Sequence, residues 1–316
     1  QAPASLDRWI PNGQAAVPGL GRPIALWPPF TEHNISDAGM LIFQARDPGG
    51  FGNTGFVAVL VAPDTGDVLG VVDVDRSPAY APLFFHRDFW GGRVGSFVVG
   101  VMALGSLFLL AAGVYLWWPA ANRIGRKLSG RPWRLSFTRA RPMHDWVGVW
   151  TLPILILLSF TGLYIAQPSW VEPAIAVMTA PDAPSTAAAA APPCGAPMTL
   201  DAAATRAAAL ANAPAFRSIY AGEGDTVWEI TFAADGSDAL HRETHVLADL
   251  SCGTLVVGAT PETRPSSEAA ALWLFGLHDG TAFGDAGPVL VSLAGVAPLI
   301  LMISGFRLWL RTRRIT

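Results

Sequence analysis

Three long stretches without a charged residue constrain the fold of this chain more than any other feature of its sequence. They run from Val94 to Trp118, from Trp146 to Val171 and from Ala286 to Phe306. About 20 apolar helical residues are enough to cross the roughly 30 Å hydrocarbon core of a bilayer. Charged residues make up only 14% of the chain, which is low for a soluble domain. We therefore expect three membrane-spanning helices.

The charges between these stretches predict how the chain is oriented. The segment 119–143 contains seven basic residues and no acidic residue, and Lys and Arg are retained on the cytoplasmic side of a membrane. Residues 1–92 and 172–285 then lie outside, where acids outnumber bases by nine to five and by fourteen to four. The net charge of −3 lacks the basic surplus of a nucleic-acid-binding protein. Membrane lipid, and not nucleic acid, is the expected surrounding partner.

These predictions divide the chain into seven parts. They are an outer domain over 1–92, a span over 93–118, a basic cytoplasmic loop over 119–143, a span over 144–171, a second outer domain over 172–285, a span over 286–310 and a cytoplasmic tail over 311–316. Within the second outer domain, residues 180–197 are rich in Pro, Ala and Ser, a composition typical of a flexible linker.

An internal repeat relates the first and third spans. His86 precedes Gly113 by 27 residues, and His278 precedes Gly305 by the same number. The outer segments before these spans each contain a predicted β-hairpin, over 59–70 and 246–257. A complete duplication predicts a further helix before Gln1, with a histidine near its cytoplasmic end. The native bundle would then contain four helices.

Other patterns in the outer segments predict small α+β domains. Strands are expected near 39–45, 55–62 and 226–232, and a helix over 200–211. Cys194 and Cys252 both lie in the second outer segment, where an oxidising compartment would permit a disulfide. A pair of unpaired thiols is the alternative, and two cysteines without a CxxC motif are too few for a zinc site.

Histidines at the ends of the spans are the main chemical signal. His86 and His278 lie at outer ends of two spans, and His144 lies at the inner end of the other. Ionisable residues at such depth are usually functional, and neutral imidazole is a common axial ligand of haem iron. His86 and His278 could bind one iron from opposite faces, whereas His144 is a full span away. Side chains that only anchor the interface are the alternative.

Motifs of other enzyme classes are missing from the sequence. His241 and His245 are four residues apart, but the glutamate of a zinc-protease motif is absent. The sequence also lacks a nucleophile elbow, a phosphate-binding loop with Lys and a dinucleotide-binding fingerprint. Hydrolase, ATPase and nicotinamide-dependent functions are therefore not expected.

The short motifs around the three histidines resemble those of a known family. Phe85-His86-Arg87, Met143-His144-Asp145-Trp146 and Leu277-His278-Asp279, with the Gly-x-x-Leu-Trp span ends and the Asp-x-x-Gly hairpins, are similar to the PepSY-associated transmembrane (PepSY-TM) family. These iron-regulated bacterial inner-membrane proteins include FoxB-like ferric-siderophore reductases. The resemblance covers nearly the whole chain. It implies an α-helical transmembrane bundle with two small α+β PepSY-like periplasmic domains.

The resemblance also implies a cofactor and its ligands. Two b-type haems are expected in the native protein. His86 and His278 would hold the periplasmic-side haem, and His144 would hold the cytoplasmic-side haem together with a histidine upstream of Gln1. The expected activity is ferric-siderophore reduction by electrons passed across the inner membrane, which releases Fe(II) because hard oxygen ligands prefer Fe(III).

The electron donor and two other functions stay open at this point. The donor would be a quinol or a cytoplasmic flavoprotein. One alternative is a haem-free PepSY membrane protein that binds a periplasmic partner or regulates a peptidase. The other is a quinol-linked b-type cytochrome that serves a different periplasmic acceptor.

Overall fold

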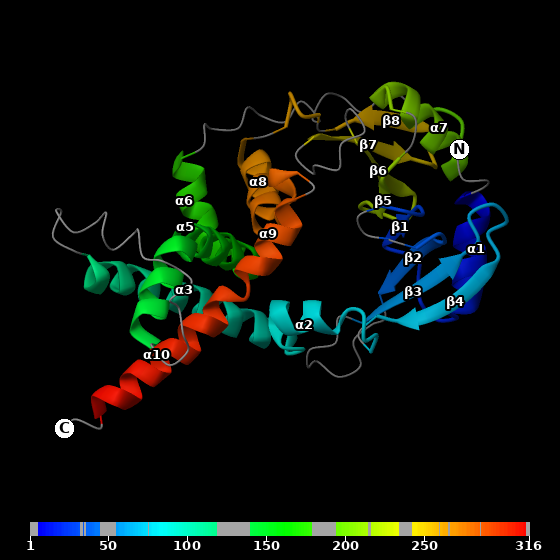
Figure 1. Ribbon diagram of the computed structural model, residues 1–316. Coiled ribbons are helices and arrows are strands. Elements are labelled where there is room, and N and C mark those ends of the chain that lie inside the picture. Colours follow the sequence, from blue (N-terminus) through cyan, green and yellow to red (C-terminus); the bar gives the residue numbers. More distant parts are fainter. Residues whose placement is uncertain are drawn as a thin grey trace. The chain divides into compact units, whose positions relative to one another are not determined.

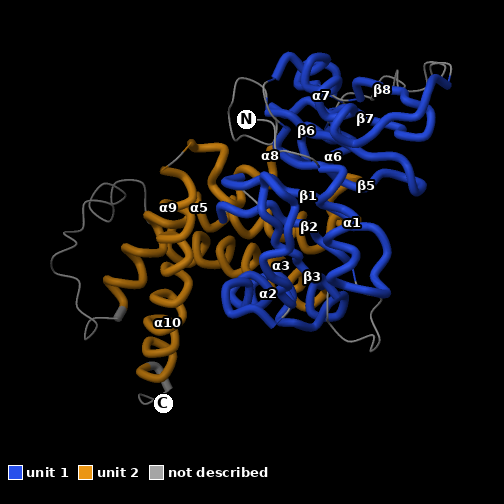
Figure 2. Tube along the Cα trace, turned by 90° about the vertical axis from the view of Figure 1, so that its right-hand side faces the viewer, with its two compact units in different colours: residues 1–96, 174–272 blue, residues 97–173, 273–316 orange. Residues whose placement is uncertain are grey.

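The chain forms two compact units in the computed structural model (Figure 2). One unit comprises residues 1–96 and 174–272, and the other comprises residues 97–173 and 273–316. The structure describes residues 6–31, 34, 36–44, 55–74, 76–118, 140–178, 194–213, 216–233, 242–258, 260–264, 266–284 and 286–313. Most of the predicted basic loop, most of the predicted linker and His241 lie outside the described residues.

An eight-stranded antiparallel sheet forms the centre of the first unit (Figure 1). Its strands are β1 (Ala25–Trp27), β2 (Gly39–Gln44), β3 (Phe56–Val61), β4 (Val68–Asp73), β5 (Ser218–Ala221), β6 (Val227–Ala233), β7 (Glu243–Asp249) and β8 (Thr254–Val257). They are ordered β4-β3-β2-β1-β5-β6-β7-β8. The order shows two four-stranded halves, which meet where β1 pairs with β5.

The two halves repeat one order of elements. Helix α1 (Leu6–Ala16) precedes β1 to β4, and helix α7 (Leu200–Ala211) precedes β5 to β8. The helix predicted over 200–211 and the hairpins predicted over 59–70 and 246–257 are confirmed, the hairpins as the pairs β3–β4 and β7–β8. The duplication inferred from the outer segments is therefore present in the fold.

The two outer segments do not form separate sheets, as two domains would. Ala25 of β1 lies opposite Tyr220 of β5, and Leu26 lies opposite Ile219. Each of these short strands would otherwise expose unpaired backbone groups at the edge of its half. Pairing satisfies both edges at once, so the two segments fold as halves of one sheet.

A single hydrophobic core runs under both halves. Alternate residues of a strand point to one face, and on β6 these are Trp228, Ile230 and Phe232, which are all buried. They belong to the same buried cluster as Trp9 of α1 and Leu41 of β2. Because this cluster contains residues from both halves and from both helices, α1 and α7 cover the same face of the sheet.

The N-termini of α1 and α7 cap each other. Asp201 accepts a hydrogen bond from the backbone N–H of Leu6 at 2.7 Å, and Asp7 accepts one from the backbone N–H of Leu200 at 2.9 Å. Carboxylates are favourable at helix N-termini, where backbone N–H groups lack partners. Burial and a hydrogen bond with Asp7 raise the pKa of Asp201. The exchange follows the repeat, since both residues occupy the second position of their helices.

Among the described residues, three helical segments are long and apolar enough to cross a membrane. They are α3 (Gly92–Trp117), α5 (Ala140–Ala166) and the pair α9 (Gly287–Ala294) and α10 (Ala297–Arg313). The first and third stretches predicted from the sequence correspond to α3 and to the pair α9 and α10. The second corresponds to α5, whose ends differ from the prediction.

Prolines explain where the observed helices differ from the predicted spans. Helix α5 begins at Ala140 and ends at Ala166, whereas the sequence predicted a span over 144–171. Pro168 begins a new helix, α6 (Pro168–Met178), because the residue before a proline is disfavoured in helical conformation. The third span breaks between α9 and α10 because Pro298 has no N–H for the carbonyl of Ala294. The length of the uncharged stretches identified the spans but not these breaks.

Short helices connect the sheet elements to the long helices along the chain. They are α2 (Ala81–Asp88), which precedes α3, and α8 (Ser266–Asp279) with the 3₁₀ turn η6 (Thr281–Phe283), which precede α9. None of these short helices was predicted from the sequence. Two of the candidate histidines lie on these short helices, His86 on α2 and His278 on α8.

Candidate functional site

His144 contacts a buried hydroxyl group of another long helix. It lies in the second turn of α5, and its Nδ1 is 2.9 Å from Oγ of Ser304 in α10. The Ser304 hydroxyl donates its proton to the carbonyl of Ile300 at 2.6 Å, and the residue has no exposed surface. A hydroxyl has one proton, so its oxygen accepts from His144. Nδ1 therefore carries the ring proton, and the lone pair is on Nε2.

A glycine beside the hydroxyl gives the ring of His144 its space. Gly305 follows Ser304, and a Cβ atom at this position would lie 3.3 Å from Cε1 of His144. That is closer than most Cβ contacts in proteins, so a larger residue would push against the ring. We name His144, Ser304 and Gly305 the His144 site.

His278 lies on α8, and residues of α5 form surroundings for it that are equivalent to those of His144. Its Nδ1 is 2.9 Å from Oγ1 of Thr161, which donates to the carbonyl of Leu157 at 2.8 Å and is fully buried. The following residue is Gly162, where a Cβ atom would lie 3.0 Å from Cε1 of His278. The ring proton is again on Nδ1. We name His278, Thr161 and Gly162 the His278 site.

The two sites lie at different levels along α5. Seventeen residues separate His144 from Thr161 in this helix, which corresponds to about 25 Å at 1.5 Å per residue. Each site joins α5 to another helix, the His144 site to α10 and the His278 site to α8. A single small cofactor could not bind both histidines.

His86 belongs to the other compact unit. It is exposed on α2, next to an ion pair in which Arg87 contacts the buried Asp88 at 2.8 Å. The chain then turns through Phe89 and Trp90, whose φ angles of 50° and 55° are unusual for residues with large side chains. The pairing of His86 with His278 stays a prediction.

The surroundings of His144 and His278 fit an axial haem ligand. A histidine that binds metal through one ring nitrogen almost always donates a hydrogen bond from the other, and both histidines donate from Nδ1. The described residues contain no group of three or more His, Cys, Asp or Glu that could hold a metal ion. Haem iron does not require such a group, because the macrocycle supplies the equatorial nitrogens and the protein supplies axial ligands.

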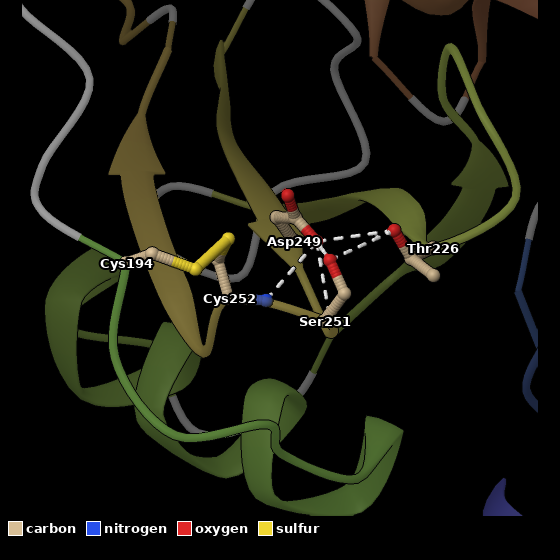
Figure 3. The surroundings of a disulfide bond; sticks show 5 residues. All are labelled: Cys194, Thr226, Asp249, Ser251 and Cys252. Atoms are coloured by element: carbon tan, nitrogen blue, oxygen red, sulfur yellow. Dashed lines mark hydrogen bonds between the residues drawn. A yellow bond between two sulfur atoms is a disulfide. The ribbon is translucent and has the colours of Figure 1, made fainter.

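A disulfide joins Cys194 to Cys252 in the first unit (Figure 3). It fixes the chain before α7 to the turn between β7 and β8, where the N–H of Gly195 also donates to the carbonyl of Cys252 at 2.7 Å. Asp249 stabilises the same turn by accepting from the backbone and the hydroxyl of Ser251 at 2.9 and 2.7 Å. These bonds lower the pKa of Asp249. The disulfide is thus part of a closed, well-bonded turn.

A charged cluster lies on the second half of the sheet, on the face opposite to α1 and α7. Arg217 and Glu243 form a buried ion pair at 3.3 Å. Nδ1 of His245 is 2.5 Å from Oε1 of Glu229, and this contact lowers the pKa of Glu229. Nη2 of Arg264 donates to the carbonyl of Glu243 at 2.8 Å. The sequence predicted His245 to be on a strand, but it gave no indication of this cluster.

Thr161 and Ser304 were also not identified as site residues from the sequence. Of their glycine neighbours, only Gly305 entered the sequence analysis, as part of the internal repeat, and glycines in membrane helices also serve ordinary helix packing. The signal in the sequence is a hydroxyl residue followed by glycine, near the end of the second span and again near the end of the third. This signal has meaning only once the helices are known to bring each pair against a histidine.

The long helices define the class of this molecule as a helical membrane protein. Residues 6–312 match the family described as "PepSY-associated TM region", and the chain belongs to this family. A comparison with curated proteins finds no match.

Proposed function

We propose that this protein is a haem-containing oxidoreductase of the bacterial inner membrane that reduces a ferric siderophore in the periplasm. The observation that carries the proposal is the geometry of the His144 and His278 sites. Two histidines lie at two levels along helix α5, His144 on α5 itself and His278 on α8, and the Nδ1 of each contacts a buried hydroxyl. Histidines that only anchor a membrane interface do not need such a partner.

The residues of the chain would act as ligands at two depths. His278 and His86 would hold the periplasmic-side haem b, and His144 would hold the cytoplasmic-side haem with a histidine from a further helix. When bound, haem supplies a one-electron carrier at each level. Thr161 and Ser304 would hold the two histidines by hydrogen bonds at Nδ1. The Nε2 atom of each ring would then be the one that binds iron.

The charge pattern and the disulfide support the direction of transfer. The basic segment 119–143 favours the cytoplasmic side, and the bond between Cys194 and Cys252 suits an oxidising periplasm. Electrons from a quinol or a flavoprotein would then move outward. One electron converts the ferric centre of a siderophore to Fe(II), which hard oxygen ligands hold less tightly.

The test is a haem count on purified full-length protein. We expect a b-type spectrum on reduction, loss of the outer haem in His278→Ala and His86→Ala, and loss of the inner haem in His144→Ala. His245→Ala is the matched control, because this histidine contacts Glu229 in the sheet and should leave both haems in place. Folded protein without haem, produced with ample haem supply, would contradict the proposal and favour a haem-free protein that binds a partner.

The acceptor needs a second measurement on the reduced protein. We expect a ferric hydroxamate or catecholate siderophore to reoxidise the haems while a ferrous chelator traps Fe(II). Reduced haems that are stable with ferric siderophores but reoxidised by another periplasmic acceptor would replace siderophore reduction by a different cytochrome function.

A further inference from the structure

We propose that Thr161 and Ser304 are positioning residues that set the electron affinity of the two haem sites through the ring N–H of His278 and His144. This inference rests on the proposed function and adds a specific role for two residues. The structure contributes the same arrangement twice, on different helices and with different histidines.

Each hydroxyl can only accept from its histidine. Thr161 donates to the carbonyl of Leu157, and Ser304 donates to the carbonyl of Ile300. Both hydroxyl residues have no exposed surface, so water does not compete for the oxygen. The order of donors is therefore fixed, from the imidazole N–H to the hydroxyl and from the hydroxyl to the backbone carbonyl.

Such a chain of hydrogen bonds strengthens its own members. A hydroxyl that donates to a carbonyl is a better acceptor, because hydrogen bonds in series polarise one another. A stronger bond at Nδ1 increases the electron density at Nε2 and makes the imidazole a more basic ligand. A basic ligand stabilises Fe(III) relative to Fe(II), and hydrogen bonds around the ligands are one means by which proteins set haem potentials.

A hydroxyl is also well suited to its location. A carboxylate would bond the ring N–H more strongly, but a charged group within a membrane is costly. A neutral hydroxyl whose proton is already bonded to its own helix leaves no polar group unsatisfied. The adjacent Gly162 and Gly305 allow the rings to approach, since a Cβ at either position would lie 3.0 or 3.3 Å from Cε1.

The test measures the midpoint potential of each haem in full-length variants. Thr161→Val removes the hydroxyl with little change in shape, and Ser304→Ala does the same in α10. Thr161→Ser and Ser304→Thr keep a hydroxyl group at each position. Thr151→Val is the matched control, because Thr151 also donates to a backbone carbonyl of α5, that of Val147 at 2.7 Å, but is hydrogen-bonded to no histidine among the described residues.

We expect each hydroxyl deletion to raise the potential of its own haem only. Substitution of the hydrogen-bond partner of a metal-binding histidine changes metal affinity by about 10-fold or more. A tenfold change in the preference for Fe(III) corresponds to about 59 mV for one electron. The midpoint potentials of the two variants that keep a hydroxyl, and of Thr151→Val, should stay near the wild-type values.

A second measurement does not depend on bound haem. In haem-free protein with ¹⁵N-labelled histidine, the ring shifts of His144 and His278 should report a proton on Nδ1, and Ser304→Ala or Thr161→Val should remove that preference. Unchanged potentials and unchanged tautomers in both deletion variants would overturn the inference. Wild-type protein that binds no haem would overturn the proposed function, and the role in tuning potentials with it, while the ¹⁵N spectra would still decide the role in positioning.

Discussion

The two halves of the sheet have the same topology but different chemistry on the face opposite to α1 and α7. In the first half this face is apolar, with Met40 and Ile42 of β2 packed near Phe84 of α2. In the second half, Glu243 of β7 forms an ion pair with Arg217, which directly precedes β5, and His245 of β7 contacts Glu229 of β6. The duplication thus preserved the backbone, while the side chains of one face diverged. Topology alone is not a guide to what each half does.

The largest expected effect is the loss of stability when an ion pair is removed, and this loss should differ between the two halves. Arg217→Met leaves Glu243 buried without this partner and should destabilise the protein by about 3–5 kcal/mol. Arg76→Met in the first half removes an exposed pair with Asp73, and we expect less than about 1 kcal/mol. Thermal unfolding of the purified variants measures both. Equal effects would contradict the difference between the halves.

The disulfide is the next test, because the described cysteines lie only in the second half. A Cys194→Ala/Cys252→Ala variant loses a link between residues 58 apart in sequence. We expect a loss of about 2–4 kcal/mol and greater protease sensitivity of α7 and the β7–β8 turn. When a reductant is added, the unfolding midpoint of the wild type should fall towards that of this variant. The midpoint of the variant itself should not change. A response of the variant to reductant would contradict this explanation.

The junction between the halves should respond to pH through Asp201. Its pKa is raised in the folded protein by burial and by Asp7, so its favourable contribution is present below the ordinary value of 3.8 and is lost as the pH rises through the folded-state pKa. Asp201→Asn should remove this loss and still accept from Leu6. Unfolding midpoints between pH 3 and pH 7 measure the slope. An Asn variant with the wild-type slope would show that another group causes it.

Glu229 should give the smallest effect, and one of opposite sign. His245 lowers its pKa in the folded protein, so its contribution is present above the ordinary value of 4.5 and is lost as the pH falls through the folded-state pKa. The side chain is 36% exposed, and we therefore expect less than about 1 kcal/mol. Glu229→Gln should flatten the acid side of the stability curve. A curve that keeps its acid slope would contradict this assignment.

The sequence predicted the elements better than the way they join. Long stretches without charged residues identified the long helices, and hairpin patterns identified β3–β4 and β7–β8. The joint between β1 and β5 was not predictable, because β1 has only three residues and its partner lies about 190 residues later. The breaks at Pro168 and Pro298 were visible in the sequence, but the prediction of spans by length alone passed over them.

The candidate site shows the same limit. His144 and His278 could be selected from the sequence because they lie beside apolar spans. Thr161 and Ser304 could not, because their role depends on the packing of helices that are 117 and 160 residues from the histidines in sequence. A contact of this kind is tertiary, and no local pattern encodes it.

The most direct test of the proposed haem sites is the number of haems bound by the full-length protein and by its single histidine variants. We expect two haems per chain, with the loss of one in His144→Ala and of the other in His278→Ala, while His245→Ala keeps both. Folded protein that binds no haem, or variants that keep the wild-type count, would contradict the proposed haem sites.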